Sequence, residues 1–215
     1  MTATSKQEKL AALFRQAIVI PVLTIERLED AVPFAKALVA GGVRVLEVTL
    51  RTPVAMAAAK AIMADVPEAI VGIGTILNAD DLARAEALGV TFGISPGATP
   101  DLLKAAAASS LPFAPGIATA SELMQALAHG FDLVKFFPAE PSGGIKALRA
   151  LAGPFPDARF CPTGGIAEAN AAAWLSEPNV VAVGGSWLCP AADIRSGNWA
   201  GISAICDRTM KSLKA

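Results

Sequence analysis

Short apolar runs rich in β-branched residues alternate with alanine-rich segments of helical periodicity along almost the whole chain. The runs predict eight strands, at residues 17–23, 43–49, 69–72, 91–95, 112–114, 133–136, 158–161 and 180–183. The segments between them predict helices at residues 28–40, 53–65, 79–88, 100–107, 121–128, 145–152 and 167–175. Because parallel strands need long crossover connections, this alternation predicts right-handed βαβ units around a parallel sheet.

Eight strands are the number that a closed (β/α)8 TIM barrel needs, and we predict that fold as a single domain over residues 1–215. Further helices at 5–14 and 199–213 would flank the barrel. The structural alternative is a doubly wound open sheet, whose dinucleotide-binding form carries Gly-x-Gly-x-x-Gly after its first strand. The only similar element, Gly72-Ile73-Gly74-Thr75, follows the third strand and lacks the third glycine, so the barrel is favoured.

The composition argues against membrane and nucleic-acid partners. Hydrophobic residues make up 53% of the chain, and the mean hydropathy is +0.51. The apolar stretch 17–25 is nevertheless too short to span a bilayer, and strands buried on both faces explain the hydropathy better. The net charge is −1 and no basic run is present, which is unlike a nucleic-acid-binding protein.

The cysteines and the histidine argue against a metal site. Three cysteines without Cys-x-x-Cys spacing indicate reduced thiols and predict a cytoplasmic location. The single histidine, His129, precedes Gly130 and suits the last turn of a helix. A histidine-based metal centre or a Ser-His-Asp triad is therefore not expected.

Lys135 lies in the middle of the apolar run Leu133-Val134-Lys135-Phe136-Phe137-Pro138. Burial disfavours the charged ammonium form, and a neutral lysine amine is a nucleophile that forms Schiff bases with carbonyl substrates. The alternative is that Lys135 ends its strand and extends its amine into water. The run therefore predicts either a catalytic amine or a simple strand end.

Polar side chains at the ends of the second and third strands are further candidates, because barrel enzymes place their active sites at the carboxyl ends of the strands. Glu47 is a lone carboxylate in the second strand and suits a general acid or base, or else a structural ion pair with Arg51. Arg51 offers a guanidinium for a substrate carboxylate, although it could be a solvated loop residue. Thr75 offers a hydroxyl to a ligand or caps the next helix.

Glycine-rich turns follow the seventh and eighth strands, as Thr163-Gly164-Gly165 and Gly184-Gly185-Ser186. Barrels commonly bind phosphate through the backbone N–H groups of loops at this position. Two Gly-Gly turns in consecutive units therefore predict a phosphate site.

Together these parts predict a Schiff-base aldolase that acts on a phosphorylated keto acid without a metal or organic cofactor. Lys135 would attack the ketone, and the resulting iminium would withdraw electrons so that a nearby C–C bond breaks. Two alternatives are a phosphate-binding barrel isomerase without imine chemistry and a non-enzymatic phosphosugar sensor.

Six segments carry a family resemblance: 43–53 (VRVLEVTLRTP), 71–78 (VGIGTILN), 94–97 (ISPG), 134–140 (VKFFPAE), 160–166 (FCPTGGI) and 184–190 (GGSWLCP). Over roughly residues 12–210 the chain resembles the 2-keto-3-deoxy-6-phosphogluconate (KDPG) aldolase family, also described as 2-keto-4-hydroxyglutarate (KHG) aldolase. The related galactonate-type aldolase differs at residues 49–51, which favours the gluconate substrate over its epimer.

The resemblance implies that Lys135 is the Schiff-base lysine and that Glu47 is the acid and base. It implies that Arg51 and Thr75 hold the pyruvyl carboxylate region and that Thr163 lines the same pocket. The implied phosphate ligands are Gly164, Gly165, Gly184 and Ser186. It also implies a homotrimer, which no pattern in the sequence indicates by itself.

Overall fold

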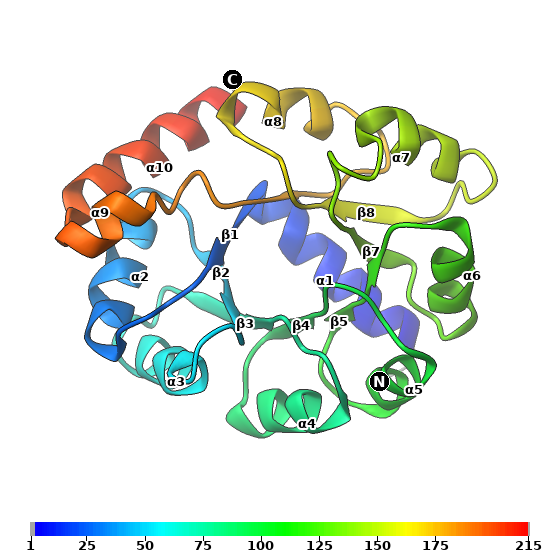
Figure 1. The fold of residues 1–215 in the computed structure, drawn as a ribbon, viewed down its shortest axis with the longest axis horizontal. Coiled ribbons are helices and arrows are strands. Elements are labelled where there is room, and N and C mark those ends of the chain that lie inside the picture. Colours follow the sequence, from blue (N-terminus) through cyan, green and yellow to red (C-terminus); the bar gives the residue numbers. More distant parts are fainter. Residues whose placement is uncertain (1–2, 215) are drawn as a thin grey trace.

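The computed structural model describes residues 3–214, in which parallel strands surround the middle of the molecule and most helices lie outside them (Figure 1). The strands are β1 (Val19–Leu23), β2 (Val45–Thr49), β3 (Ile70–Gly74), β4 (Phe92–Ile94), β5 (Phe113–Ala114), β6 (Gly116–Ile117), β7 (Leu133–Phe136), β8 (Arg159–Pro162) and β9 (Val183–Gly185). The helices are α1 (Ala3–Ala17), η1 (Leu28–Asp30), α2 (Ala31–Ala40), α3 (Ala55–Asp65), α4 (Ala79–Leu88), α5 (Pro100–Ala108), α6 (Ala120–Ala128), α7 (Gly144–Ala152), α8 (Glu168–Leu175), α9 (Ala191–Ser196) and α10 (Trp199–Lys214).

The strands form two parallel sheets, one in the order β5-β4-β3-β2-β1-β9 and one in the order β6-β7-β8. The predicted continuous eight-stranded ladder is therefore only partly present, although the parallel α/β architecture is confirmed. Pro115 separates β5 from β6, and a proline has no N–H with which to continue a ladder. The two sheets approach each other again through the bridges Phe160↔Val180 and Thr163↔Gly184.

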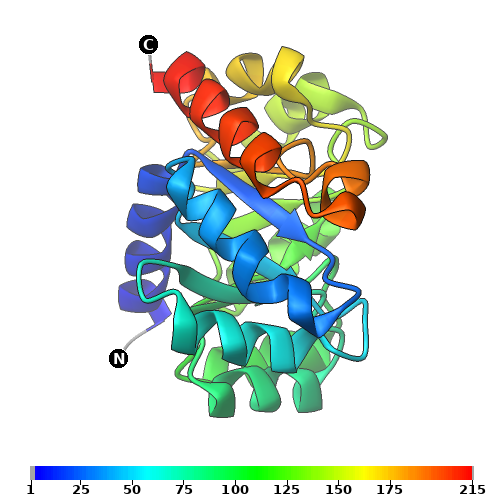
Figure 2. The ribbon, with the colours of Figure 1, turned by 90° about the vertical axis from the view of Figure 1, so that its left-hand side faces the viewer.

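Helix α1 crosses one end of the strands, as Figures 1 and 2 show from two sides. Its side chains Leu10 and Phe14 are buried against the sheet, and the Phe14 ring meets Phe92 edge-on with centroids 5.4 Å apart. Gln7 of the same helix donates to the Phe113 carbonyl and accepts from the Leu133 N–H. These contacts close the amino-terminal end of the strands, so a ligand has access from the opposite end.

A continuous apolar layer lies between the strands and the outer helices. Its largest fully buried side chains include Phe34, Phe113, Phe136, Phe160 and Trp174. On one side α10 packs against α2, which places the last helix beside the first βα unit (Figure 2). None of the helices within residues 3–214 is both long enough and apolar enough to cross a membrane.

The sequence predicted one strand at 112–114, where the structure has β5 and the additional strand β6, and two further local features differ as well. The last strand was expected at 180–183, but β9 lies at Val183–Gly185 because Val19, Ile20 and Pro21 of β1 pair with these three residues. Glycines have little intrinsic strand preference, and their presence concealed this pairing. The short helix α9 was not expected, since six residues are too few to show helical periodicity.

Candidate active site

Lys135 and Glu47 meet inside the ring of strands. The Lys135 Nζ lies 2.9 Å from Glu47 Oε1, and the two side chains are only 6% and 2% exposed. The two residues come from β7 and β2, which belong to different sheets, so the contact spans the interior. The alternative in which Lys135 extends into water is therefore wrong.

The space for the Glu47 carboxylate depends on Gly74, at the end of β3. A Cβ atom at that position would lie 2.1 Å from Glu47 Oε1 and 2.7 Å from its Cδ. Such distances are far below van der Waals contact, so a side chain at residue 74 would displace the carboxylate from Lys135. Gly74 therefore leaves the space that the Lys135–Glu47 ion pair needs.

Cys161 lies beside the Lys135–Glu47 pair and was not among the predicted site residues. It pairs with Lys135 in the register of β7 and β8 and is only 3% exposed. Burial raises the pKa of its thiol to about 12, while the Lys135 charge acts to lower that pKa and Glu47 acts to raise it. The thiol is therefore neutral at ordinary pH. Its position opposite Lys135 follows from parallel register, but sequence alone does not give the register.

Phe137 also borders the lysine, since the Lys135 Nζ lies 5.4 Å from the centroid of the Phe137 ring. The same Phe137 lines a cavity of about 140 Å³ that opens beside the glycine-rich turns. This cavity brings together six of the predicted binding residues: Arg51, Thr163, Gly164, Gly165, Gly184 and Ser186. The two loops after the last strands thus line one cavity together with Phe137, the residue whose ring lies near the Lys135 amine.

The Thr163-Gly164-Gly165 turn has a backbone shape that requires glycine. Gly164 and Gly165 have φ values of +100° and +80°, which side-chain-bearing residues rarely adopt. On the neighbouring loop a Cβ at Gly184 would lie 2.1 Å from Thr163 Oγ1. Gly184 therefore allows the Thr163 side chain to lie against β9.

Glu140 holds this turn in place and was also missed by sequence reasoning. Its Oε1 accepts hydrogen bonds from Trp174 Nε1 at 2.9 Å and Asn170 Nδ2 at 3.1 Å. Its backbone N–H donates to the Gly164 carbonyl at 3.0 Å, and its Cβ lies close to Gly165. Glu140, four residues after the end of β7, thus connects the glycine turn to α8.

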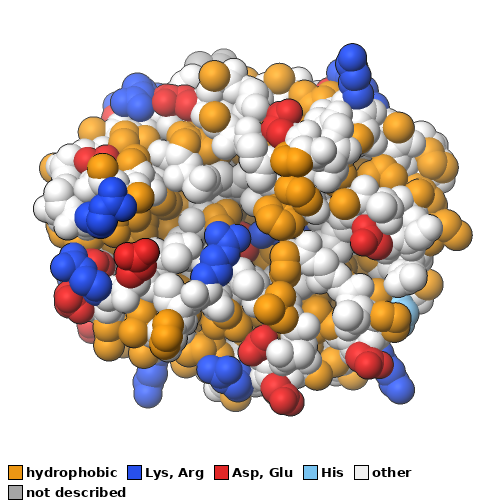
Figure 3. Space-filling view, viewed as in Figure 1, with side chains coloured by type: hydrophobic (Ala, Val, Ile, Leu, Met, Phe, Trp, Pro, Cys, Tyr) orange, Lys and Arg blue, Asp and Glu red, His pale blue; other side chains and the backbone are white. Residues whose placement is uncertain are grey.

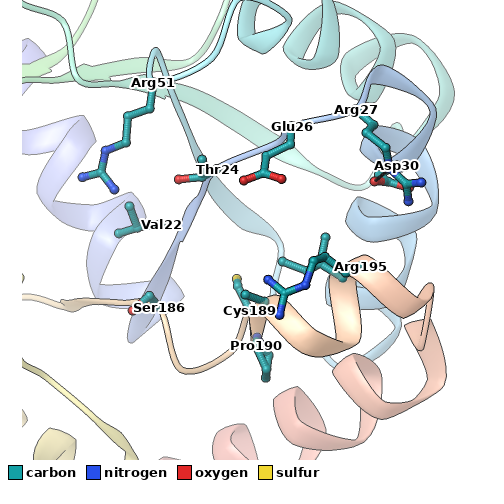
Figure 4. A pocket seen from close by; sticks show the side chains of 12 residues that line it. Val22, Thr24, Glu26, Arg27, Asp30, Arg51, Ser186, Cys189, Pro190 and Arg195 are labelled. Atoms are coloured by element: carbon teal, nitrogen blue, oxygen red, sulfur yellow. Dashed lines mark hydrogen bonds and ion pairs between the residues drawn. The ribbon is translucent and has the colours of Figure 1, made fainter.

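A larger cavity of about 440 Å³ adjoins the small one, and both are lined by Val22, Arg51 and Ser186. The large cavity extends between the segment after β1 and helix α9 (Figure 4). Figure 3 shows that the face opposite α1 is hollowed near its middle, with Lys and Arg side chains at the edge of the hollow.

Thr75 lies apart from these two cavities. It lines a separate hollow of about 220 Å³ together with Leu50, Thr52 and Arg84. Its φ of +60° is unusual for a threonine, and such strain, of order 1–3 kcal/mol, is concentrated at functional sites. The structure therefore does not bring Thr75 into the cavity of the glycine turns, although its backbone is consistent with a special role.

No group of three or more His, Cys, Asp or Glu side chains arranged to hold a metal ion occurs among residues 3–214. The polar groups that converge on the interior are instead an amine, a carboxylate, a guanidinium and hydroxyls. This set suits covalent carbonyl chemistry with proton transfer and anion binding.

Comparison with known proteins gives a consistent result. The family model described as KDPG and KHG aldolase matches residues 10–205. The KHG/KDPG aldolase of Escherichia coli (strain K12) is 53% identical over 196 residues, which make up 91% of this chain and 92% of the relative.

Two solved structures are similar over nearly the whole chain. A KDPG aldolase from Legionella pneumophila, with pyruvate captured at low pH as a covalent carbinolamine, is 46% identical with a TM-score of 0.90, covering 93% of this chain and 97% of that chain. The enzyme of Zymomonas mobilis ZM4 with 3-phosphoglycerate is 47% identical with a TM-score of 0.89, and the coverage is 94% and 95%. This chain belongs to the KDPG and KHG aldolase family.

Proposed function

We propose that the protein is a class I aldolase, a lyase that cleaves KDPG to pyruvate and glyceraldehyde 3-phosphate through a Schiff base on Lys135. The observation that carries the proposal is the buried Lys135–Glu47 contact of 2.9 Å, because it places a proton acceptor at the amine. The covalent carbinolamine of pyruvate in the similar Legionella pneumophila enzyme supports the same chemistry.

The reaction begins when the neutral amine of Lys135 adds to the C2 carbonyl and gives a carbinolamine, which loses water to leave an iminium. Removal of the C4 hydroxyl proton breaks the C3–C4 bond, releases the aldehyde and leaves an enamine. The enamine carbon takes up a proton, and hydrolysis frees pyruvate and restores the amine. Glu47 is the carboxylate within reach of Lys135 that can accept and return these protons.

The other site residues bind the two ends of the substrate in this proposal. Arg51 holds the carboxylate, and Thr163 lines the pocket of the reacting ketone. The phosphate is bound by the turns with Gly164, Gly165, Gly184 and Ser186, whose shared cavity supports the assignment. Thr75 lines a separate hollow, so its role at the carboxylate stays a prediction from the family resemblance.

A second substrate is 4-hydroxy-2-oxoglutarate, which would give pyruvate and glyoxylate by the same steps. The name of the Escherichia coli relative supports this activity. The gluconate epimer of the phosphorylated substrate is favoured over the galactonate epimer because two curated relatives, at 51% and 53% identity, are named for the former.

The proposal extends to the architecture. The chain forms a single domain in which the two sheets close as one (β/α)8 barrel, and the bridge Thr163↔Gly184 supports closure between β8 and β9. Assembly as a homotrimer and a cytoplasmic location stay predictions. Light scattering of the purified protein measures the first of these directly.

The test is borohydride reduction in the presence of pyruvate, followed by peptide mass spectrometry. We expect one reduced pyruvyl adduct, on Lys135, and no adduct in Lys135→Ala. Lys104→Ala, which removes an exposed lysine, serves as the matched control and should be labelled like the wild type. An adduct on another lysine, or cleavage activity that persists in Lys135→Ala, would refute the mechanism.

A further inference from the structure

The large cavity holds charged groups that the proposed mechanism does not use. Figure 4 shows Glu26 and Arg195 projecting into it from opposite sides, the first from the segment after β1 and the second from α9. Arg51 lies at the end that this cavity shares with the small cavity of the glycine turns. A substrate phosphate bound at the glycine turns would therefore face the large cavity.

Three arginines line the cavity, but only two of them are available to a ligand. Arg27 makes two hydrogen bonds of 2.8 Å to the carboxylate of Asp30, so these two charges neutralise each other. Within residues 3–214 neither Arg51 nor Arg195 forms an ion pair, and neither does Glu26.

Charge balance assigns a role to the second unpaired arginine. A phosphate monoester carries about −1.5 to −2 charges near pH 7. The glycine turns and Ser186 offer only neutral donors, and Arg51 is engaged by the substrate carboxylate. Arg195 is the remaining unpaired cation that lines the cavity next to these donors.

We propose that Arg195 is a specificity-determining residue that favours phosphorylated substrates, and that Glu26 opposes it from the facing wall. This inference rests on the proposed aldolase function. Arg195 attracts the phosphate dianion across the cavity, and Glu26 repels the dianion or competes for the guanidinium. Because both side chains are exposed, each contributes only a modest, salt-dependent effect.

The test compares Arg195→Gln and Glu26→Gln, which remove charges of opposite sign. Titration calorimetry with 3-phosphoglycerate should show affinity about fivefold weaker in the first variant and tighter in the second. The value of kcat/KM for KDPG should change in the same directions, and kcat/KM for 4-hydroxy-2-oxoglutarate, whose distal carboxylate carries a single charge, should change much less. Added salt should reduce both differences.

Two controls separate charge from structure. Arg195→Lys keeps the positive charge and should retain most of the wild-type preference. Arg208→Gln removes an exposed arginine of α10 that pairs with Glu168 and should leave both substrates unaffected. If Arg195→Gln binds 3-phosphoglycerate as tightly as the wild type, or weakens both substrates equally, the role of Arg195 is refuted.

The proposed aldolase function is tested by a different experiment, the borohydride trapping, and it is refuted if the wild type forms no pyruvate adduct. The calorimetric comparison does not depend on turnover, so it tests Arg195 whichever way the trapping experiment ends.

Discussion

Gly74→Ala offers a severe test of the proposed site, because it adds one methyl group and leaves the side chains of Lys135 and Glu47 chemically unchanged. The new Cβ would lie 2.1 Å from Glu47 Oε1 and 2.6 Å from Glu47 Cγ, whereas ordinary contact begins at about 3.4 Å. The Glu47 Oε1 atom must therefore move by about 1.3 Å, which is the ordinary contact distance of about 3.4 Å minus the 2.1 Å that the new Cβ would leave. The φ of Gly74 is not positive, so the cost comes from this collision and not from the backbone.

That displacement breaks the Lys135–Glu47 hydrogen bond, which is 2.9 Å long. Misplacement of a catalytic group by about 1 Å can cost on the order of 100-fold in rate, and loss of general acid–base catalysis costs about 10²–10⁴-fold. Separating a buried ion pair also leaves both charges without compensation and destabilises a protein by about 3–5 kcal/mol. We therefore expect kcat for KDPG to fall at least about 100-fold in Gly74→Ala.

The assay measures kcat per folded molecule, with the folded fraction taken from urea unfolding of the same sample. Gly93→Ala is the matched control, since it adds a methyl group to the neighbouring strand β4, 2.9 Å from Ile76 Cδ1 and 3.0 Å from Phe113 Cδ2. It should lower stability and leave kcat near the wild-type value. Turnover by folded Gly74→Ala within about twofold of the wild type would show that Glu47 does not carry the proton transfers.

Two further predictions concern residues that the sequence did not single out. Glu140→Ala leaves the Trp174 Nε1 without its acceptor and frees the glycine turn. Urea unfolding should therefore show that the free energy of unfolding is lower by about 1–3 kcal/mol. The KM for KDPG should also rise more than the KM for 4-hydroxy-2-oxoglutarate. Cys161 has a folded pKa of about 12 and an ordinary value of 9.0, so the unfolded chain loses this proton first as pH rises. Stability should therefore fall between about pH 9 and 12, by up to about 1.4 kcal/mol per pH unit more in the wild type than in Cys161→Ala.

The catalytic pair shows how far sequence reasoning can reach. Lys135 and Glu47 were singled out separately, each as a charge in an apolar strand, and their ionic nature made burial costly enough to require a partner. Their contact joins residues 88 positions apart in different sheets, and only a fold in which the strands surround a common interior brings them together. The pairing of Glu47 with Arg51, which local spacing suggested, does not occur among the described contacts.

The features that escaped prediction depend on register and on long-range packing. The alternation of side chains along β8 predicts that Cys161 points to the interior of the protein, but only the pairing of β7 with β8 places it opposite Lys135. Glu140 acts through Trp174 and Asn170 of another unit, and no local pattern reveals such a contact. Similarly, the separation of Thr75 from the glycine turns follows from the path of the chain after β3, where the backbone takes a positive φ.

The glycines illustrate why a correct location can be accompanied by an incomplete reason. Sequence reasoning assigned Gly184 to a phosphate-binding turn and noted Gly74 only as part of the Gly72-Ile73-Gly74-Thr75 element. In the structure each lies where a Cβ would strike a polar side chain, Glu47 in one case and Thr163 in the other. Glycine at the end of a strand can thus be required by a neighbouring functional side chain, because the interior is too narrow for both. A glycine at the end of a strand can therefore indicate a site for two reasons. It either contacts the ligand itself or leaves space for a neighbouring side chain that contacts the ligand, and only the geometry distinguishes the two.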